Sequence, residues 1–181
     1  SSNVALSMRE IRTALETCTG VRGRCEVIPT GRDFTVICDY AHTPDAVENI
    51  LRSLKEYTKG RLICLFGCGG NRDATKRPKM AKAAAKYADF LVITSDNPRD
   101  EEPEAIVADI LTGLEGSDVP YEVVIDRKDA ILRSMQMAQP GDVIVLAGKG
   151  HEDYQALKNG VHIHMDEREI VRDCLPLVPE R

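Results

Sequence analysis

Four consecutive residues, Asp96, Asn97, Pro98 and Arg99, bring both signs of charge into one short loop. The Arg99 guanidinium can bind a carboxylate, the Asp96 carboxylate can bind an ammonium, and the Asn97 amide can pair with either. Such a set suits a free amino acid, which carries both charges. The alternative is a plain turn, stiffened by Pro98, in which Arg99 pairs with the acids that follow it, Asp100, Glu101 and Glu102.

A second loop, GCGGNRD at residues 67–73, combines three glycines with Arg72. Glycines allow a sharp turn or a close approach of the backbone to a ligand. The loop is neither a Walker A sequence nor a complete GxGxxG fingerprint. Arg72 can clamp a carboxylate or a phosphate with two hydrogen bonds, or it can be a solvated surface arginine. The loop by itself leaves both interpretations open.

A third loop, GKGHEDYQ at residues 148–155, supplies glycines, a lysine, His151 and Glu152. It is not a P-loop, because no Ser or Thr follows the lysine at the required spacing. Glu152 can bind an ammonium. His151 is either a general base or, as is more common for a lone loop histidine, a hydrogen-bonding residue.

A fourth loop, DYAHTPD at residues 39–45, follows a strand-like run directly. Asp39 stands at the end of that run, where a carboxylate can accept ribose hydroxyls in nucleotide-binding folds. His42 stands at the start of a predicted helix, next to Thr43, which is a good capping residue. The loop therefore suits either a nucleotide contact or ordinary helix capping.

Apolar and β-branched runs predict the strands that position these loops: 34–39, 61–66, 90–94, 121–125 and 143–147. The runs are nearly continuous, which is typical of strands buried on both faces. Amphipathic stretches between them predict helices at 44–57, 77–88, 103–115 and 127–138. This alternation predicts an α/β fold, a Rossmann-like open sheet of about six strands, mostly parallel, with helices on both faces. Ligands bind such sheets at the carboxyl ends of the strands, where all four loops lie.

Both ends of the chain depart from this alternation. The run VHIHM (161–165) follows a hairpin-like KNG, which predicts one antiparallel strand at the edge of the sheet. A final helix is predicted at 167–175, before Pro176. Residues 1–21 predict a helix with no strand beside it, either an added helix or the end of a preceding domain.

Composition narrows the function classes. The chain has 181 residues, of which 43% are hydrophobic and 29% charged, and a net charge of −5. An acidic balance disfavours binding to nucleic acid, and no apolar run approaches the roughly 20 residues that span a membrane. No secretory h-region is present at the start. Six cysteines without a CxxC pair predict reduced thiols in a cytoplasmic protein rather than disulfides or a metal site.

The four loops together are more specific than each one alone. GRCEV, DYAHTPDA, FGCGGNRDATKRP, SDNPR and GKGHEDYQ follow one another between about Arg22 and the end. This set resembles the C-terminal domain of the Mur ligases, and the DNPR loop resembles that of members that add meso-diaminopimelate rather than lysine. Residues 1–21 resemble the final helix of the central, ATPase domain, and residues 22–181 the C-terminal domain that binds the amino acid.

The resemblance implies a three-domain cytoplasmic enzyme of peptidoglycan synthesis. An N-terminal domain would hold the substrate UDP-MurNAc-L-Ala-D-Glu, and a central domain ATP and Mg²⁺. The reaction implied is ATP-dependent amide formation, in which an acyl phosphate of the D-glutamate side chain is attacked by the amine of diaminopimelate. No GxxxxGK[ST] motif occurs in this chain. We therefore expect ATP and Mg²⁺ to bind mainly outside it, and the chain alone to be an inactive monomer.

The resemblance also implies a set of amino-acid-binding residues, carried over motif by motif: Arg72, Asp96, Asn97, Pro98, Arg99, Gly148 and Glu152. Arg72 would hold the carboxylate nearer the reacting amine. Arg99 and Asn97 would hold the distant carboxylate, which lysine lacks. Glu152, Asp96 and the Gly148 carbonyl would hold the distant ammonium. Lysine would leave Arg99 unpaired and be rejected.

Three further residues are implied contacts of ATP. Arg24 resembles a hinge arginine that reaches the nucleotide when the domains close, and Asp39 and His42 resemble residues on its ribose and base side. The family pattern has proline before this Gly-Arg pair, whereas this chain has Arg22, which affects hinge stiffness but leaves Arg24 in place. No catalytic residue and no metal ligand is expected in the chain itself.

Three rival functions remain at this point. The first is a lysine-adding ligase of the same family, which Arg99 disfavours. The second is a non-catalytic amino-acid-binding module, which the helix predicted before Arg22 disfavours. The third is a nicotinamide-dependent dehydrogenase, suggested by fold class alone and disfavoured by the missing GxGxxG sequence.

Overall fold

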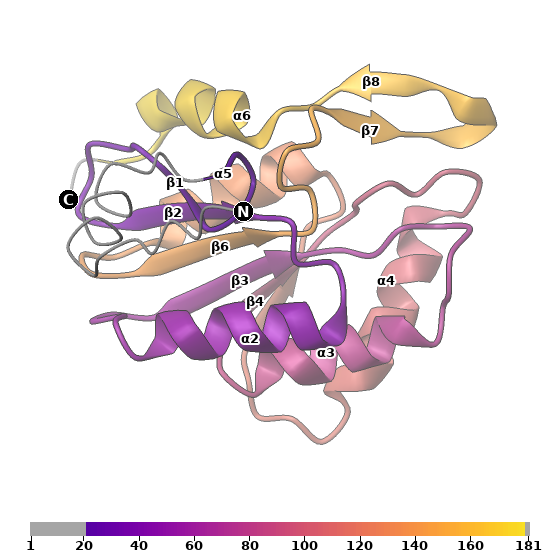
Figure 1. Cartoon of the computed structure of the whole chain (residues 1–181), viewed down its shortest axis with the longest axis horizontal. Helices are drawn as coiled ribbons and strands as arrows, with labels where there is room; N and C mark the ends of the chain where they lie inside the picture. Colours follow the sequence, from indigo (N-terminus) through magenta and orange to yellow (C-terminus); the bar gives the residue numbers. More distant parts are fainter. Residues whose placement is uncertain (1–20, 180–181) are drawn as a thin grey trace, which may run out of the picture.

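The structure is a computed structural model that describes residues 21–179. The helix predicted within residues 1–21 falls outside the described residues. The main element is one six-stranded sheet in the order β1-β2-β6-β3-β4-β5 (Figure 1). Its strands are β1 (Glu26–Ile28), β2 (Thr35–Asp39), β3 (Leu62–Phe66), β4 (Phe90–Ile93), β5 (Tyr121–Val123) and β6 (Val143–Ala147).

All neighbouring strands of this sheet are parallel except β1, which pairs antiparallel with β2 at one edge. The central strands β3 and β6 are almost fully buried, as their continuous apolar sequences predict. The predicted fold class is confirmed: an open, mostly parallel sheet of six strands with one antiparallel edge strand.

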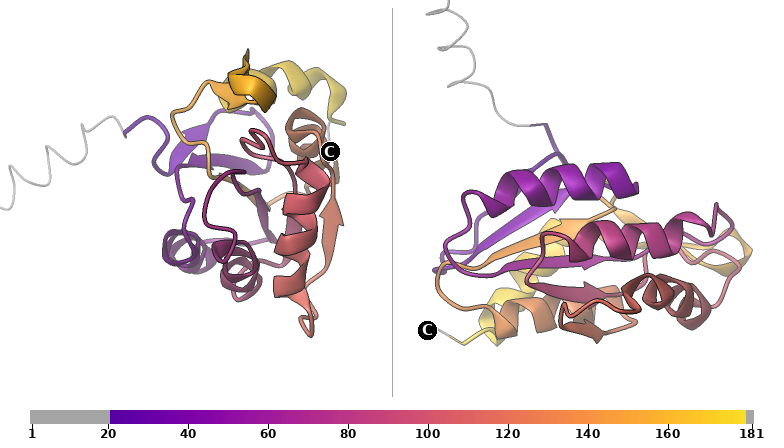
Figure 2. Two further views of the ribbon diagram at one scale, coloured as in Figure 1. Left: turned by 90° about the vertical axis from the view of Figure 1, so that its right-hand side faces the viewer. Right: turned by 90° about the horizontal axis from the view of Figure 1, so that it is seen from below.

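Helices cover both faces of the sheet. One face carries α2 (Pro44–Lys55), α3 (Lys76–Ala85) and α4 (Pro103–Leu111), and the other carries α5 (Arg127–Met137) and α6 (Glu167–Cys174) (Figure 2). Two separate apolar clusters, one for each face, form the core. Two predicted starts are confirmed: Pro44 and Pro103 stand in the first turns of their helices, where a missing N–H costs nothing.

The position predicted for the antiparallel edge strand was wrong. The run at 161–165 forms β8 (His162–His164), which pairs with β7 (Tyr154–Ala156) in a separate two-stranded ribbon. The edge strand of the main sheet is instead β1, only three residues long. All three residues of β8 are exposed, whereas β7 is half-buried and its Ala156 is buried. Figure 1 shows the ribbon projecting beyond the end of α6, on the side where the arrows of β3 and β6 point.

Candidate functional site

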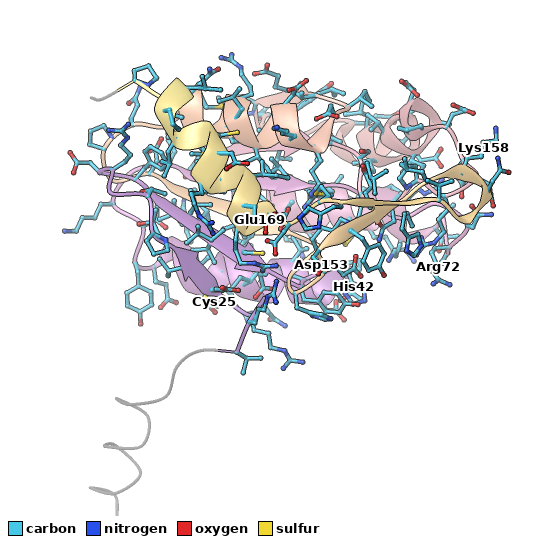
Figure 3. All side chains as sticks on the ribbon, turned by 90° about the horizontal axis from the view of Figure 1, so that it is seen from above. Cys25, His42, Arg72, Asp153, Lys158 and Glu169 are labelled. Carbon is cyan, nitrogen blue, oxygen red and sulfur yellow. The ribbon has the colours of Figure 1, made fainter. Side chains whose placement is uncertain are left out.

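The four polar loops meet around one cavity of about 350 Å³ at the carboxyl ends of the strands. This volume lies in the range of small-molecule sites. Figure 3 labels His42 and Arg72 beside the β7–β8 ribbon, whose tip carries Lys158. Six of the seven predicted amino-acid-binding residues line the cavity: Arg72, Asp96, Asn97, Arg99, Gly148 and Glu152.

Pro98 is the exception, because it is buried behind the wall of the cavity rather than in it. Its carbonyl oxygen lies so close to Gly70 that a Cβ atom there would stand 1.9 Å away. The Gly70 N–H also donates a hydrogen bond of 2.9 Å to the Asn97 carbonyl. Pro98 therefore shapes the contact between two loops. Glycine at position 70 is required by this close backbone approach.

Arg99 does not pair with the acids that follow it. Its guanidinium donates to the Gly70 carbonyl at 2.9 Å and to the Asn97 carbonyl at 3.4 Å. Within residues 21–179, no carboxylate lies at ion-pair distance from it. Glu101 binds the buried Arg77 at 2.7 Å instead. The plain-turn interpretation of this loop is wrong in that respect, since a half-buried cation lines the cavity without an anion.

Arg72 is exposed and lines the same cavity. The loop that carries Arg72 is held by Glu101, which accepts a hydrogen bond from the Asn71 N–H at 2.5 Å. This bond, together with the one from Arg77, lowers the pKa of the Glu101 carboxyl. Arg72 and Arg99 thus give the cavity a cationic wall that is supported by an ionised acid.

Asp96 and Glu152 line the same cavity and form its acidic wall. Asp96 is only 8% exposed, and its buried Oδ1 atom accepts no hydrogen bond. Glu152 uses one oxygen, Oε2, to accept from Asn97 Nδ2 at 3.1 Å. Asp96 Oδ1 faces the Lys149 ammonium at 3.5 Å. The other oxygens, Asp96 Oδ2 and Glu152 Oε1, accept no hydrogen bond from residues 21–179, so the acidic wall has spare acceptors for an ammonium.

Lys149 lies behind this acidic wall, and sequence reasoning assigned it no role. Its side chain is completely buried, and its ammonium donates to Asn97 Oδ1 at 2.6 Å and to the Tyr154 carbonyl at 2.5 Å. Asp96 and Glu152 lie farther away, at 3.5 and 3.4 Å. Burial lowers the pKa of the Lys149 ammonium. Only its place in GKGHE, between two glycines of a site loop, could have pointed to it.

A second buried cation, Arg127, lies under the same loops. It pairs with the fully buried Glu167 at 2.8 Å. Its remaining N–H groups donate to the carbonyls of Ser95 and Ala147, at 3.2 and 2.9 Å. These carbonyls stand directly before Asp96 and Gly148, so Arg127 holds together the ends of β4 and β6. An arginine in a first helical turn carries no sequence signal for this role.

A second cavity, of about 370 Å³, adjoins the first and shares Tyr40 and His42 with it. It contains all three residues predicted to contact the nucleotide, Arg24, Asp39 and His42. The Tyr40 ring lies 4.6 Å from the His42 ring and 5.0 Å from the ring of His151. Tyr40 and His42, which line both cavities, form part of the boundary between them.

Asp39 has a structural role in addition to lining this cavity. One carboxylate oxygen accepts from the Cys25 N–H at 2.7 Å, and the other from the Ala41 N–H at 2.8 Å. Arg24, by contrast, is exposed, and no partner of its guanidinium is found in the described part of the chain. The free cation of the second cavity is therefore Arg24, as a contact to a nucleotide phosphate requires.

Two further properties concern the described residues only. Across residues 21–179, no three His, Cys, Asp or Glu side chains are grouped so that they could hold a metal ion. Helices long and apolar enough to cross a membrane are also missing from this range.

The structure is an α/β domain with a cavity that has one cationic and one acidic wall, beside a second cavity that contains Arg24. Comparison with known families identifies the class of protein. Residues 23–150 match the family described as "Mur ligase, glutamate ligase domain". The chain belongs to the Mur ligase family.

Among curated proteins, the chain is 52% identical over 172 residues to the UDP-N-acetylmuramoyl-L-alanyl-D-glutamate–2,6-diaminopimelate ligase of Caldanaerobacter subterraneus subsp. tengcongensis. It is 50% identical over 166 residues to the ligase of the same name from Syntrophomonas wolfei. These matches cover 95% and 91% of this chain but only 35% and 34% of the relatives. The chain therefore spans about a third of their length.

Solved structures give the same result. A 2,6-diaminopimelate ligase of that name superposes with a TM-score of 0.80 and 39% identity, over 95% of this chain and 35% of the other. A bifunctional folylpolyglutamate synthase/dihydrofolate synthase from Yersinia pestis has a TM-score of 0.61 at 22% identity, over 82% of this chain and 33% of that one. The second likeness shows a shared fold alone.

Proposed function

We propose that this chain is the amino-acid-binding part of an ATP-dependent ligase that joins meso-diaminopimelate to UDP-MurNAc-L-Ala-D-Glu in the cytoplasm. One observation carries the proposal: Arg99 lines the cavity as a cation without an anion, and two carboxylates with spare acceptors line it as well. The names of the relatives, which include 2,6-diaminopimelate, support the same substrate.

The proposed ligand has an amino-acid group at each end. Arg99 and the Asn97 amide bind the distant carboxylate, and Asp96, Glu152 and the Gly148 carbonyl bind the distant ammonium. Arg72 binds the carboxylate nearer the reacting amine. When both ends of the ligand are bound, its reacting amine is held in one position. The chain contributes to catalysis by this positioning, because the entropy of orienting the amine is lost before the reaction.

Lysine is the alternative ligand, because it has the distant ammonium but lacks the distant carboxylate. With lysine bound, Arg99 would remain half-buried without an anion, as it is in the structure. A site that hydrogen-bonds a ligand group rejects an analogue lacking it strongly, by a factor of roughly 10⁴ in favourable cases. The free guanidinium therefore favours diaminopimelate.

The residues of the second cavity fit the nucleotide of such a ligase. The Arg24 guanidinium would bind a phosphate, and Asp39 would accept a ribose hydroxyl through a lone pair that its backbone bonds leave free. His42 and the Tyr40 ring would face the base. ATP would supply the phosphoryl group that activates the acceptor carboxylate, and the ligands of Mg²⁺ would lie in the rest of the ligase.

The test is a calorimetric titration of the chain with meso-diaminopimelate and with lysine. We expect binding of meso-diaminopimelate only, lost in Arg99→Ala and kept in Arg133→Ala, whose arginine pairs with Glu122 on the surface. The titration is repeated on a chimera in which the chain replaces the last third of the Caldanaerobacter ligase. Equal binding of lysine, or no binding of meso-diaminopimelate in either protein, would overturn the proposal.

A further inference from the structure

Lys149 occupies an unusual place for a lysine, since it is completely buried beside a polar cavity. A buried ammonium is costly unless it is paired and hydrogen-bonded. Here its two shortest hydrogen bonds go to the side chain of Asn97 and the backbone of Tyr154, not to a carboxylate. Lys149 thus links its own loop, 148–155, to the DNPR loop, and residues of both loops line the cavity.

The contact with Asn97 settles which way that amide faces. Asn97 Oδ1 accepts from the Lys149 ammonium at 2.6 Å and from the Ala156 N–H at 2.9 Å. With its oxygen occupied by two donors, the amide must direct its nitrogen toward Glu152 and the cavity. Asn97 can therefore donate to a ligand carboxylate but cannot accept from a ligand ammonium.

The contacts with the carboxylates set the charge of the acidic wall. Asp96 and Glu152 together carry two negative charges, and Lys149, at about equal distances from both, balances one of them. The remaining single charge matches one ligand ammonium. Without Lys149, two uncompensated carboxylates would attract a simple cation and repel a ligand carboxylate next to it.

We propose that Lys149 is a positioning residue that makes the site selective for a zwitterionic end group over a simple ammonium. It does so by fixing Asn97 as a donor and by balancing one carboxylate of the acidic wall. The inference rests on the proposed amino-acid-binding function and adds the residue that sets its selectivity, which touches no ligand itself.

The experiment compares Lys149→Met, which keeps the length of the side chain without its charge, with the wild-type chain. Calorimetry gives the Kd of meso-diaminopimelate and of lysine for each. Because a charge-assisted hydrogen bond is lost, we expect the Kd of meso-diaminopimelate to rise at least about tenfold. The Kd of lysine stays the same or falls, so the ratio of the two affinities moves toward lysine. Lys86→Met, which removes an exposed lysine paired with Glu48, is the matched control.

A second variant covers the case in which Lys149→Met does not fold. Asn97→Asp keeps an acceptor for Lys149 and Ala156 but replaces the nitrogen that faces the cavity by an oxygen. We expect the neighbouring Lys149 ammonium to keep this variant folded, although its new oxygen faces Glu152, and meso-diaminopimelate affinity to fall at least about tenfold.

The outcomes separate the two proposals. A wild-type chain and chimera that do not bind meso-diaminopimelate refute the proposed function itself. If the wild type binds, but Lys149→Met weakens both ligands by the same factor or neither, Lys149 is merely structural and the inference fails. Unchanged meso-diaminopimelate affinity in Asn97→Asp overturns it as well.

Discussion

Two buried charge clusters lie under the same loops, and they differ in how completely they are satisfied. In the closed cluster, Arg127 and Glu167 pair with each other, and the remaining Arg127 N–H groups donate to backbone carbonyls. In the open cluster, Asp96 Oδ2 and Glu152 Oε1 accept no hydrogen bond from the described residues. The closed cluster has nothing left to offer a ligand, whereas the open cluster is incomplete without one.

The difference shows how similar charges can serve stability in one place and binding in another. Arg127 satisfies the carbonyls that end β4 and β6, so its contacts fix where the loops begin. Lys149 instead contacts the side chains of Asn97 and Glu152, which line the cavity. Buried charge alone therefore does not mark a binding site; carboxylate oxygens that line a cavity and lack a donor do.

Breaking the closed cluster is expected to have the largest effect on stability. Glu167→Gln leaves the completely buried Arg127 without an anion, which should lower the free energy of unfolding by about 3–5 kcal/mol. Urea denaturation measures this loss. The double variant Arg127→Met/Glu167→Leu should recover part of it, but not all, because the Ser95 and Ala147 carbonyls lose their donor. A loss below about 1 kcal/mol for Glu167→Gln would contradict the assignment.

The same kind of change in the open cluster should act in the opposite way. Asp96→Asn removes a buried charge whose Oδ1 atom has no hydrogen bond, while Lys149 keeps Asn97, Glu152 and Tyr154 as partners. We expect the free energy of unfolding to change by less than about 1 kcal/mol. The affinity for meso-diaminopimelate should fall at least about tenfold in calorimetry. If Asp96→Asn lowered the free energy of unfolding as much as Glu167→Gln does, the two clusters would not differ in the way described.

The pH dependence of stability tests whether ionised Glu101 holds the loop that carries Arg72. The pKa of Glu101 is lowered by the Asn71 N–H and by Arg77, so its contribution is present above the unfolded value of about 4.3 and is lost as pH falls through the lower folded pKa. Glu101→Gln should therefore be less stable than the wild type at pH 7, and this difference should shrink at pH 3. Parallel urea titrations measure it, with the exposed Glu115→Gln as control. A difference independent of pH would refute the ionic role.

Thiol labelling should show the smallest change, since it leaves the fold intact. Burial and Glu167 raise the pKa of Cys38 far above its usual range, and burial raises the pKa of Cys68 to about 12. Cys25 is exposed beside the second cavity. At pH 8, iodoacetamide should alkylate Cys25 and spare Cys38 and Cys68 until the chain unfolds. Peptide mass spectrometry reads each site separately, and rapid labelling of Cys68 would contradict the packing of its loop.

Much of the fold could be predicted from the sequence because most of its strands are continuous apolar runs. The runs that became β2, β3, β4 and β6 are apolar on both faces, and only a doubly covered parallel sheet buries such strands. β1 could not be found that way, since three residues with an exposed Val27 carry no periodic signal. VHIHM looked like an edge strand because periodicity cannot tell which strand a segment pairs with.

Site residues could be predicted where the charge of the side chain and its place in a loop indicate what it binds. Arg72, Arg99 and Glu152 stand in polar loops at strand ends, and the cavity contains all three. Ion-pair partners were harder to predict. Glu101 is close to Arg99 in sequence, yet it pairs with Arg77 of α3. Lys149 was missed because its partner Asn97 lies in a distant loop, and no local pattern encodes that contact.

The β7–β8 ribbon has a consequence for redesigning this domain. Ala156 at the end of β7 uses both of its backbone groups on the DNPR loop, donating to Asn97 Oδ1 and accepting from the Arg99 N–H at 3.1 Å. A graft that exchanges residues 96–99 alone would leave the Ala156 N–H without an acceptor wherever the new loop lacks an asparagine. The smallest transplantable unit is therefore discontinuous, the loop at 95–99 together with the segment 149–156.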